Sequence, residues 1–117
     1  MFLQREDHGR VCVIRLPERL TMAHAASHRH AIRDVVDGGH SRLVMDMSGV
    51  EFVDSSGLSV LVSALKAARN ADGDVVISGP TPEVQALIEL TRLHHLFEIF
   101  ADDQAAVHYL EPRDAAA

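Results

Sequence analysis

Two adjacent hydroxyl groups stand at the predicted start of a helix. They belong to the run Asp54-Ser55-Ser56-Gly57, which follows a strand-like segment and opens a helix-like one. A helix N-terminus carries unpaired backbone N–H groups and about half a positive charge, so a phosphoryl group on a hydroxyl there meets favourable donors. The run therefore suits a covalent charge switch that needs no catalytic groups of its own. The alternative is a plain helix cap, because Asp and Ser are preferred at this position.

The surrounding sequence resembles a known family. Residues 43–58 are similar to the signature of the STAS family, and more narrowly to that of the bacterial anti-sigma factor antagonists. The resemblance extends over residues 5–110 and includes the later run at 90–100. In that group the second Ser of Asp-Ser-Ser-Gly is the phosphorylated one. The resemblance therefore assigns the modification to Ser56, with Ser55 as the second candidate.

The resemblance also implies a partner-switching cycle. An anti-sigma factor with ATP-dependent serine kinase activity would bind the unphosphorylated protein, phosphorylation of Ser56 would break the complex, and a serine phosphatase would restore it. Phosphoserine adds about −1.5 to −2 charge at neutral pH, and a hundredfold loss of affinity needs only about 2.8 kcal/mol. Like-charge contact or desolvation at an interface supplies a free energy of that size.

Residues around the acceptor hydroxyl are expected to contact the partner. This set comprises Thr21, Asp46, Asp54, Ser55, Gly57 and Leu58. Asp46 and Asp54 would repel a phosphate, so they are expected to cap the helix or to ligate a metal that the kinase carries. Gly57 is expected to let a partner backbone approach closely. The chain departs from the family in one loop, where Glu18 and Thr21 replace the usual Gly and acid, which bears on the identity of the partner.

A second function fits the same resemblance. A STAS subunit of a membrane transport complex of the ABC type would dock to an ATPase or a permease, and the hydroxyls would then carry no phosphoswitch. Co-purification with membrane proteins that is insensitive to Ser56→Asp would favour this alternative. The oligomeric state stays open on the sequence alone.

Composition argues against several classes of protein. The 117 residues fit one domain, which we expect to span residues 1–111, followed by a disordered tail over 112–117. The net charge is −6 and Lys66 is the only lysine, which argues against nucleic acid and favours a protein partner with a basic patch. The chain lacks Gly-x-Ser-x-Gly, Gly-x-Gly-x-x-Gly and P-loop sequences, so we expect no enzyme activity.

Eight histidines raise the question of a metal site. His24 and His28 have the i, i+4 spacing that can bind zinc, and His30 lies nearby. No Cys pair or His-Glu-x-x-His run completes such a site, so we expect solvated surface histidines, no metal and no cofactor. Cys12 lies within an apolar run, which predicts a buried structural thiol. With one cysteine, no signal-peptide-like start and no apolar run of about 20 residues, the protein is expected to be cytoplasmic.

Hydrophobic patterning predicts the elements that position the hydroxyls. The expected elements are a hairpin over 2–6 and 11–16, helices over 22–36 and 56–70, strands over 42–47 and 75–77, a helix from Pro82 capped by Thr81, a strand over 97–100, and a last helix capped by Asp102 or Asp103. The first helix is expected to bury Met22, Ala25, Ala26, Ile32 and Val36. Alternating helices and apolar strands predict an α/β fold with at least one parallel crossover. The family resemblance implies a curved mixed sheet of four or five strands packed with about four helices.

Overall fold

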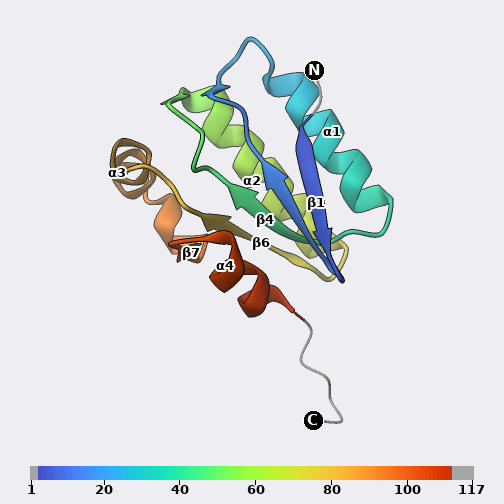
Figure 1. The fold of residues 1–117 in the computed structure, drawn as a ribbon. Helices are drawn as coiled ribbons and strands as arrows, with labels where there is room; N and C mark the ends of the chain where they lie inside the picture. Colours follow the sequence, from blue (N-terminus) through green and yellow to red (C-terminus); the bar gives the residue numbers. More distant parts are fainter. Residues whose placement is uncertain (1–2, 112–117) are drawn as a thin grey trace.

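One five-stranded sheet forms the centre of the protein (Figure 1). The computed structural model describes residues 3–111. The strands are β1 (Gln4–His8), β2 (Val11–Arg15), β4 (Arg42–Asp46), β6 (Asp74–Ser78) and β7 (Ile99–Phe100). Their order in the sheet is β1-β2-β4-β6-β7, with β1 antiparallel to β2 and the other three pairings parallel. The predicted mixed sheet with an N-terminal hairpin is confirmed.

Helices cover both faces of this sheet. In residues 3–111 they are α1 (Ala25–Asp37), α2 (Ser55–Asn70), α3 (Pro82–Leu90) and α4 (Asp103–Leu110), with a 3-10 turn η1 (Leu93–His95). α1 and α2 pack against each other on one face, and α4 packs on the other, as Figure 1 shows. The expected α/β architecture with about four helices is therefore confirmed.

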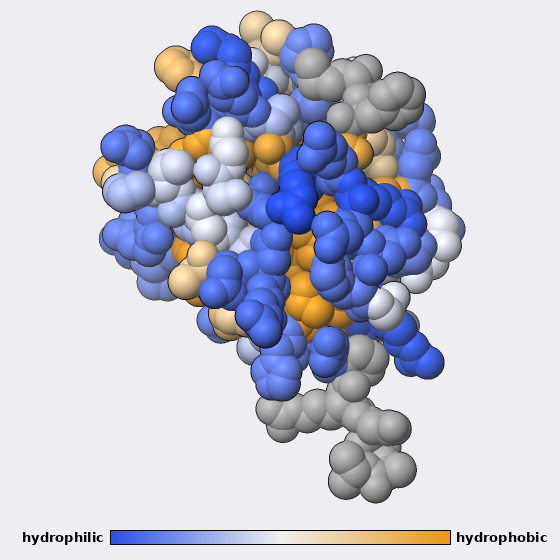
Figure 2. Space-filling model, viewed as in Figure 1, coloured by the Kyte–Doolittle hydropathy of each residue, from blue (hydrophilic) through white to orange (hydrophobic). Residues whose placement is uncertain are grey.

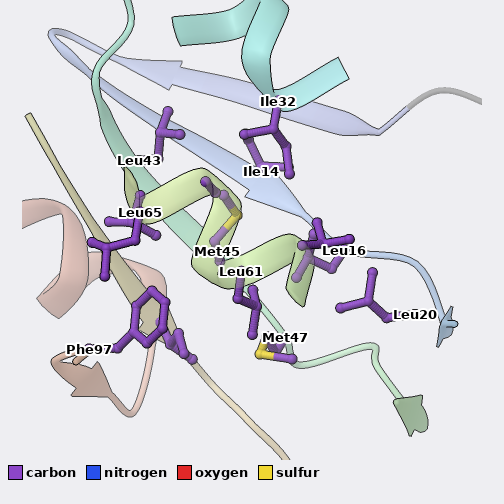
Figure 3. Packing of buried hydrophobic residues seen from close by; sticks show 14 of the residues in the cluster. Ile14, Leu16, Leu20, Ile32, Leu43, Met45, Met47, Leu61, Leu65 and Phe97 are labelled. Carbon is purple, nitrogen blue, oxygen red and sulfur yellow. The ribbon is translucent and has the colours of Figure 1, made fainter. Parts of the chain in front are cut away.

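Alternating side chains of the central strands supply two hydrophobic clusters. Cys12 and Ile14 of β2 belong to the larger cluster, which also contains the buried side chains of α1 and α2. Val11 and Val13 belong to the smaller cluster under α4. Successive strand residues point to opposite faces, so an unbroken apolar run indicates burial on both. Figure 3 shows Leu61 of α2 among the side chains of the larger cluster. The predicted burial of Cys12 is confirmed.

The edge strand β1 is polar and exposed to solvent. All residues of β1 are exposed, and the strand begins at Gln4 and ends at His8 rather than covering the expected 2–6. Gly9 supplies the turn to β2 with a positive φ of 63°. Figure 2 shows a mainly hydrophilic face in which hydrophobic residues appear as a narrow band between polar ones.

The buried stripe of α1 differs from the expected one. The helix begins at Ala25, and Met22 is 75% exposed. Ala26 is also exposed, whereas His28 is fully buried and takes the place in the stripe between Ala25 and Ile32. The expectation that the histidines are solvated is therefore wrong for His28. A pattern search that treats His as polar misses such a position, because its ring is large enough to fill a core site.

The helix caps follow local sequence rules. The Thr81 hydroxyl accepts a hydrogen bond from the Val84 N–H, and Pro82 occupies the first turn of α3, as predicted. Asp102 caps α4 by accepting from the Ala105 N–H at 2.9 Å. Of the two expected alternatives, Asp102 is therefore the cap of α4.

A short second sheet was not expected from the sequence. It consists of β3 (Arg19–Leu20) and β5 (Phe52–Val53), which pair in parallel. Two-residue strands produce no readable period, so patterning cannot detect them. This pair leads directly into α2 and sets where that helix begins.

Within 3–111 no helix is long and apolar enough to cross a membrane. Over the same residues no group of three or more His, Cys, Asp or Glu side chains is placed to hold a metal ion. The expected tail over 112–117 lies outside the described residues, and the domain boundary at 111 stays a prediction.

Candidate functional site

Asp54 organises the start of α2. Its carboxylate accepts a hydrogen bond from the Gly57 N–H at 2.9 Å, which is the predicted helix cap. The second carboxylate oxygen accepts from the Met22 N–H at 2.9 Å. These two backbone N–H groups, Met22 first, hold the pKa of Asp54 below its usual value. One ionised side chain therefore joins the loop before α1 to the first turn of α2.

Gly57 allows the chain's own backbone to approach α2. A Cβ at this position would stand 2.0 Å from the carbonyl oxygen of Leu20 in β3. The same carbonyl accepts a hydrogen bond from the Asp54 N–H at 3.3 Å. The close approach expected for a partner backbone is thus occupied by Leu20, and the glycine is required for the fold at this point.

The two candidate acceptor hydroxyls differ in exposure. Ser55 is exposed and Ser56 is half-buried. Neither hydroxyl makes a hydrogen bond to any residue within 3–111, which leaves both free to react. The backbone carbonyl of Ser56 accepts a hydrogen bond from the Ser59 hydroxyl at 2.6 Å. That bond places Ser59 next to Ser56 on one side of α2.

Exposed apolar side chains flank this helix start. Met22 is 75% exposed and Phe52 is 53% exposed. The Arg19 guanidinium lies 4.7 Å from the centre of the Phe52 ring, in cation–π geometry. Neither residue was among those expected to contact a partner, since Met22 was expected to be buried. An aromatic residue two positions before the Asp54 cap is the sequence signal that could have indicated this surface.

The structure brings together most of the predicted partner-binding set. Thr21 is half-buried and immediately precedes Met22, whose N–H bonds to Asp54. Leu58 is on the first turn of α2, but its side chain is buried in the larger hydrophobic cluster. Leu58 therefore packs in the core below this surface, and its side chain is not exposed for contact with a partner.

Asp46 lies on the face of the sheet that α4 covers, opposite to the face that α1 and α2 cover. Its carboxylate accepts from Arg15 Nη1 at 2.9 Å and from the Ser48 hydroxyl at 2.6 Å, and it adjoins Asp103 of α4. Burial favours the neutral form, but the Ser48 hydroxyl and N–H and the Arg15 charge outweigh it and lower the pKa of Asp46. Its polar contacts are thus with β2, α4 and the loop that follows β4, and within residues 3–111 none joins it to Ser55 or Ser56.

The pKa of the neighbouring Asp103 is raised, whereas that of Asp46 is lowered. Burial is the largest cause that raises the pKa of Asp103, and the nearby Asp46 carboxylate adds to it, although the Ser78 hydroxyl donates to Asp103 at 2.5 Å. Arg15 Nη1 lies 3.5 Å from the Asp103 carboxylate and so bridges both acids. This cluster fastens α4 to the carboxyl ends of the strands.

The loop that departs from the family pattern is held by its backbone. The carbonyl of Glu18 accepts hydrogen bonds from the N–H groups of Glu51 and Phe52, at 2.8 and 3.1 Å. The Glu18 side chain itself is exposed. Because the bonds use the main chain, the acid at position 18 changes the charge of this surface while the fold keeps its connections.

Comparisons with known proteins agree with this geometry. The family model of the STAS domain matches residues 3–106. The anti-sigma-F factor antagonist RsfB of Mycobacterium tuberculosis is 31% identical over 96 residues, which cover 81% of this chain and 77% of RsfB. A crystal structure of an anti-sigma factor antagonist from Mycobacterium paratuberculosis aligns with a TM-score of 0.84 and 27% identity, covering 95% of this chain and 94% of the other.

Two solved structures represent one antagonist in two states. The antagonist SpoIIAA in its unphosphorylated form aligns with a TM-score of 0.79 and 19% identity, over 97% of this chain and all of SpoIIAA (100%). The phosphorylated form, from Bacillus, aligns with a TM-score of 0.74 and 20% identity, over 94% and 100%. At these identities the likeness concerns the fold. On the family match and the RsfB similarity, the chain belongs to the STAS domain family and is of the anti-sigma factor antagonist type.

Proposed function

We propose that this protein is a partner-switching regulator controlled by phosphorylation of Ser56. The unphosphorylated form binds an anti-sigma factor that is also a serine kinase, phosphorylation releases that partner, and a serine phosphatase resets the switch. The observation that carries the proposal is the Ser56 hydroxyl, which is free of hydrogen bonds to residues 3–111 in the first turn of α2. Ser55 is the second candidate acceptor.

The surroundings of Ser56 explain why a phosphate would act against binding. Exposed Met22 and Phe52 flank the helix start and offer apolar contact area to a partner. A phosphoserine brings about −1.5 to −2 charge to this surface, beside the ionised Asp54. Burying that charge against a partner requires desolvation that apolar contacts cannot offset. A hundredfold weakening corresponds to about 2.8 kcal/mol.

In this proposal the protein acts by binding and performs no catalysis of its own. It is the substrate of the kinase and of the phosphatase, and it works in the cytosol where both enzymes and the sigma factor meet. Support comes from relatives that are named anti-sigma factor antagonists and from the structures of SpoIIAA in unphosphorylated and phosphorylated forms.

Binding measurements with three variants test the proposal. The partner is the ATPase recovered with the wild-type protein from its native cells, purified and titrated in vitro. Ser56→Asp should weaken binding, and Ser56→Ala should bind normally but resist phosphorylation. Gln104→Glu adds one negative charge at an exposed position of α4, on the other side of the sheet, and should bind as wild type.

Equal binding by all three variants would contradict the phosphoswitch. In that case, recovery of a permease or transport ATPase from membranes, insensitive to Ser56→Asp, would favour the alternative role as a transport subunit. Intact-mass measurement of the native protein provides an independent check, because a phosphoryl group lost in Ser56→Ala places the modification on that residue.

A further inference from the structure

One backbone donor at the start of α2 is already in use. The Gly57 N–H donates to Asp54 Oδ1, and the other oxygen of the same carboxylate accepts from Met22. A phosphate on Ser56 would therefore stand beside the Asp54 carboxylate, which caps the same turn. Two neighbouring anions repel each other, so a stably held phosphate at this position needs a cation from another element.

α1 offers such a cation across the helix pair. Arg29 Nη1 donates to the Ser59 hydroxyl at 3.3 Å, and that hydroxyl donates to the Ser56 carbonyl at 2.6 Å. Two consecutive hydrogen bonds thus join the guanidinium to the acceptor residue. Ser56 and Ser59 are spaced i, i+3, which places them on one side of α2. Within 3–111 Arg29 makes no ion pair, so its charge is available.

The same side of the helix pair forms a cationic groove. A cavity of about 280 Å³ lies between α1 and α2, and its lining comprises Arg29, His30, Ile32, Arg33, Ser63, Ala64 and Ala67. The lining contains two arginines and no carboxylate. Arg33 lies one helical turn after Arg29, and Ser63 one turn after Ser59, so the groove runs away from Ser56. Arg29 is the arginine at its Ser56 end.

We propose that Arg29 binds the phosphate of phosphorylated Ser56, exchanging its hydrogen bond to Ser59 for a pair of bonds to phosphate oxygens. The planar guanidinium presents two parallel N–H donors that match a phosphate. The pair ties α1 to the first turn of α2 and holds the phosphate on the protein's own surface. The phosphatase must then break this pair before it removes the phosphate. The inference rests on the proposed phosphorylation of Ser56.

The test uses phosphoserine installed at position 56 during translation, so that neither kinase nor partner is needed. Phosphorus-31 NMR follows the second ionisation of the phosphate in the full chain. A nearby guanidinium favours the dianion and lowers the second pKa of the phosphate. Arg29→Gln should therefore raise that pKa by about 0.5, an effect of the size expected for an exposed ion pair. High salt should reduce the difference.

Arg33→Gln is the matched control. It removes the same charge from the same helix, one turn farther from Ser56, and it should leave the phosphate titration close to wild type. Equal titration of wild type and Arg29→Gln would overturn the proposal, and so would an equal effect of Arg33→Gln. Amide spectra of the unphosphorylated variants check the fold, and they should match those of the wild type because Arg29 and Arg33 are both exposed.

Failure of this inference is distinguishable from failure of the proposed function. Binding of the partner by the phosphoserine-56 protein reports on the switch, whereas the phosphorus titration reports on Arg29. If the phosphorylated protein binds its partner as tightly as the unphosphorylated one, the switch is wrong whatever Arg29 does. If phosphorylation abolishes binding but Arg29→Gln leaves the second pKa of the phosphate unchanged, the switch stands and the Arg29 assignment is wrong.

Discussion

The carbonyl oxygen of Leu20 occupies the space that a side chain on Gly57 would need. A Cβ at Gly57 would lie 2.0 Å from this oxygen, closer than any real contact. Leu20 is fully buried at the end of β3, and Gly57 is buried in the first turn of α2. The position of the candidate acceptor helix relative to β3 thus depends on the absence of one carbon atom.

Gly57→Ala should therefore destabilise the protein. We expect a loss of roughly 2–3 kcal/mol in the free energy of unfolding, because the obstacle is backbone and cannot rotate away. Gly49→Ala is the matched control, since a Cβ there meets nothing within 4 Å. Urea unfolding of both variants measures the difference. Equal midpoints for the two would contradict the steric account.

Asp54→Ala should loosen two segments at once. The carboxylate accepts from the N–H groups of both Met22 and Gly57, so its loss leaves both donors to solvent. Amide hydrogen exchange should become faster at Met22 and Gly57 and stay unchanged at Val84, whose N–H bonds to Thr81 in another helix. Unchanged protection at Met22 would show that Asp54 does not tie this loop to α2.

His28 should make stability sensitive to mild acid. The ring is fully buried, and neither of its nitrogens has a hydrogen-bond partner in the described part of the chain. Burial, followed by the proximity of His24, lowers the pKa of His28 below the usual 6.5. The unfolded chain then binds a proton more readily than the folded one. The contribution of neutral His28 to the free energy of unfolding is therefore complete above about pH 6.5. It is lost as the pH falls toward the pKa of His28 in the folded protein.

Substitution of His28 tests this linkage. His28→Leu should raise the free energy of unfolding at pH 5 by about 1–2 kcal/mol, because it removes an unsatisfied buried polar group. It should also flatten the dependence of stability on pH between 5 and 6.5. His108→Leu, at an exposed position of α4, serves as the control. If His28→Leu keeps the slope of the wild type, His28 is not the titrating group.

Cys12 should resist thiol reagents until the protein unfolds. Burial, together with the nearby Asp7 carboxylate, raises the pKa of the thiol to about 12. A disulfide reagent at mildly alkaline pH should react slowly with the native chain and quickly in denaturing guanidinium. Because the folded pKa is raised above the usual 9.0, stability should fall as the pH rises from about 9 toward 12. Fast labelling of native protein would contradict the burial of Cys12.

Phe52 should contribute directly to partner binding. Its ring is 53% exposed beside the acceptor helix and is held by Arg19. Phe52→Ala is expected to weaken binding of the anti-sigma factor by about tenfold or more, as aromatic residues at interfaces do. Leu90→Ala removes a more exposed apolar side chain, 81% accessible, from the end of α3 and should leave affinity unchanged. Calorimetric titration separates the two outcomes, and equal effects would place the interface elsewhere.

Much of the fold followed from local patterns in the chain. Apolar runs identified β2, β4 and β6, and the cap residues Asp54, Thr81 and Asp102 marked the starts of three helices. These features depend on residues a few positions apart, whose physics is the same in any fold. The acceptor hydroxyls at a helix start could be predicted for the same reason.

Contacts between distant residues decided the rest. Met22 and Asp54 are 32 positions apart, and Arg29 and Ser59 are 30 apart, so no sequence window contains either pair. Asp46 was expected near the hydroxyls, but alternation along β4 turns it toward α4. The sequence alone therefore determined the helices and the strands of the central sheet, and it predicted which hydroxyls are candidates for modification. Only the packing of those elements, which brings remote side chains together, decided that His28 is buried, that Gly57 meets Leu20 and that Arg29 lies beside Ser59.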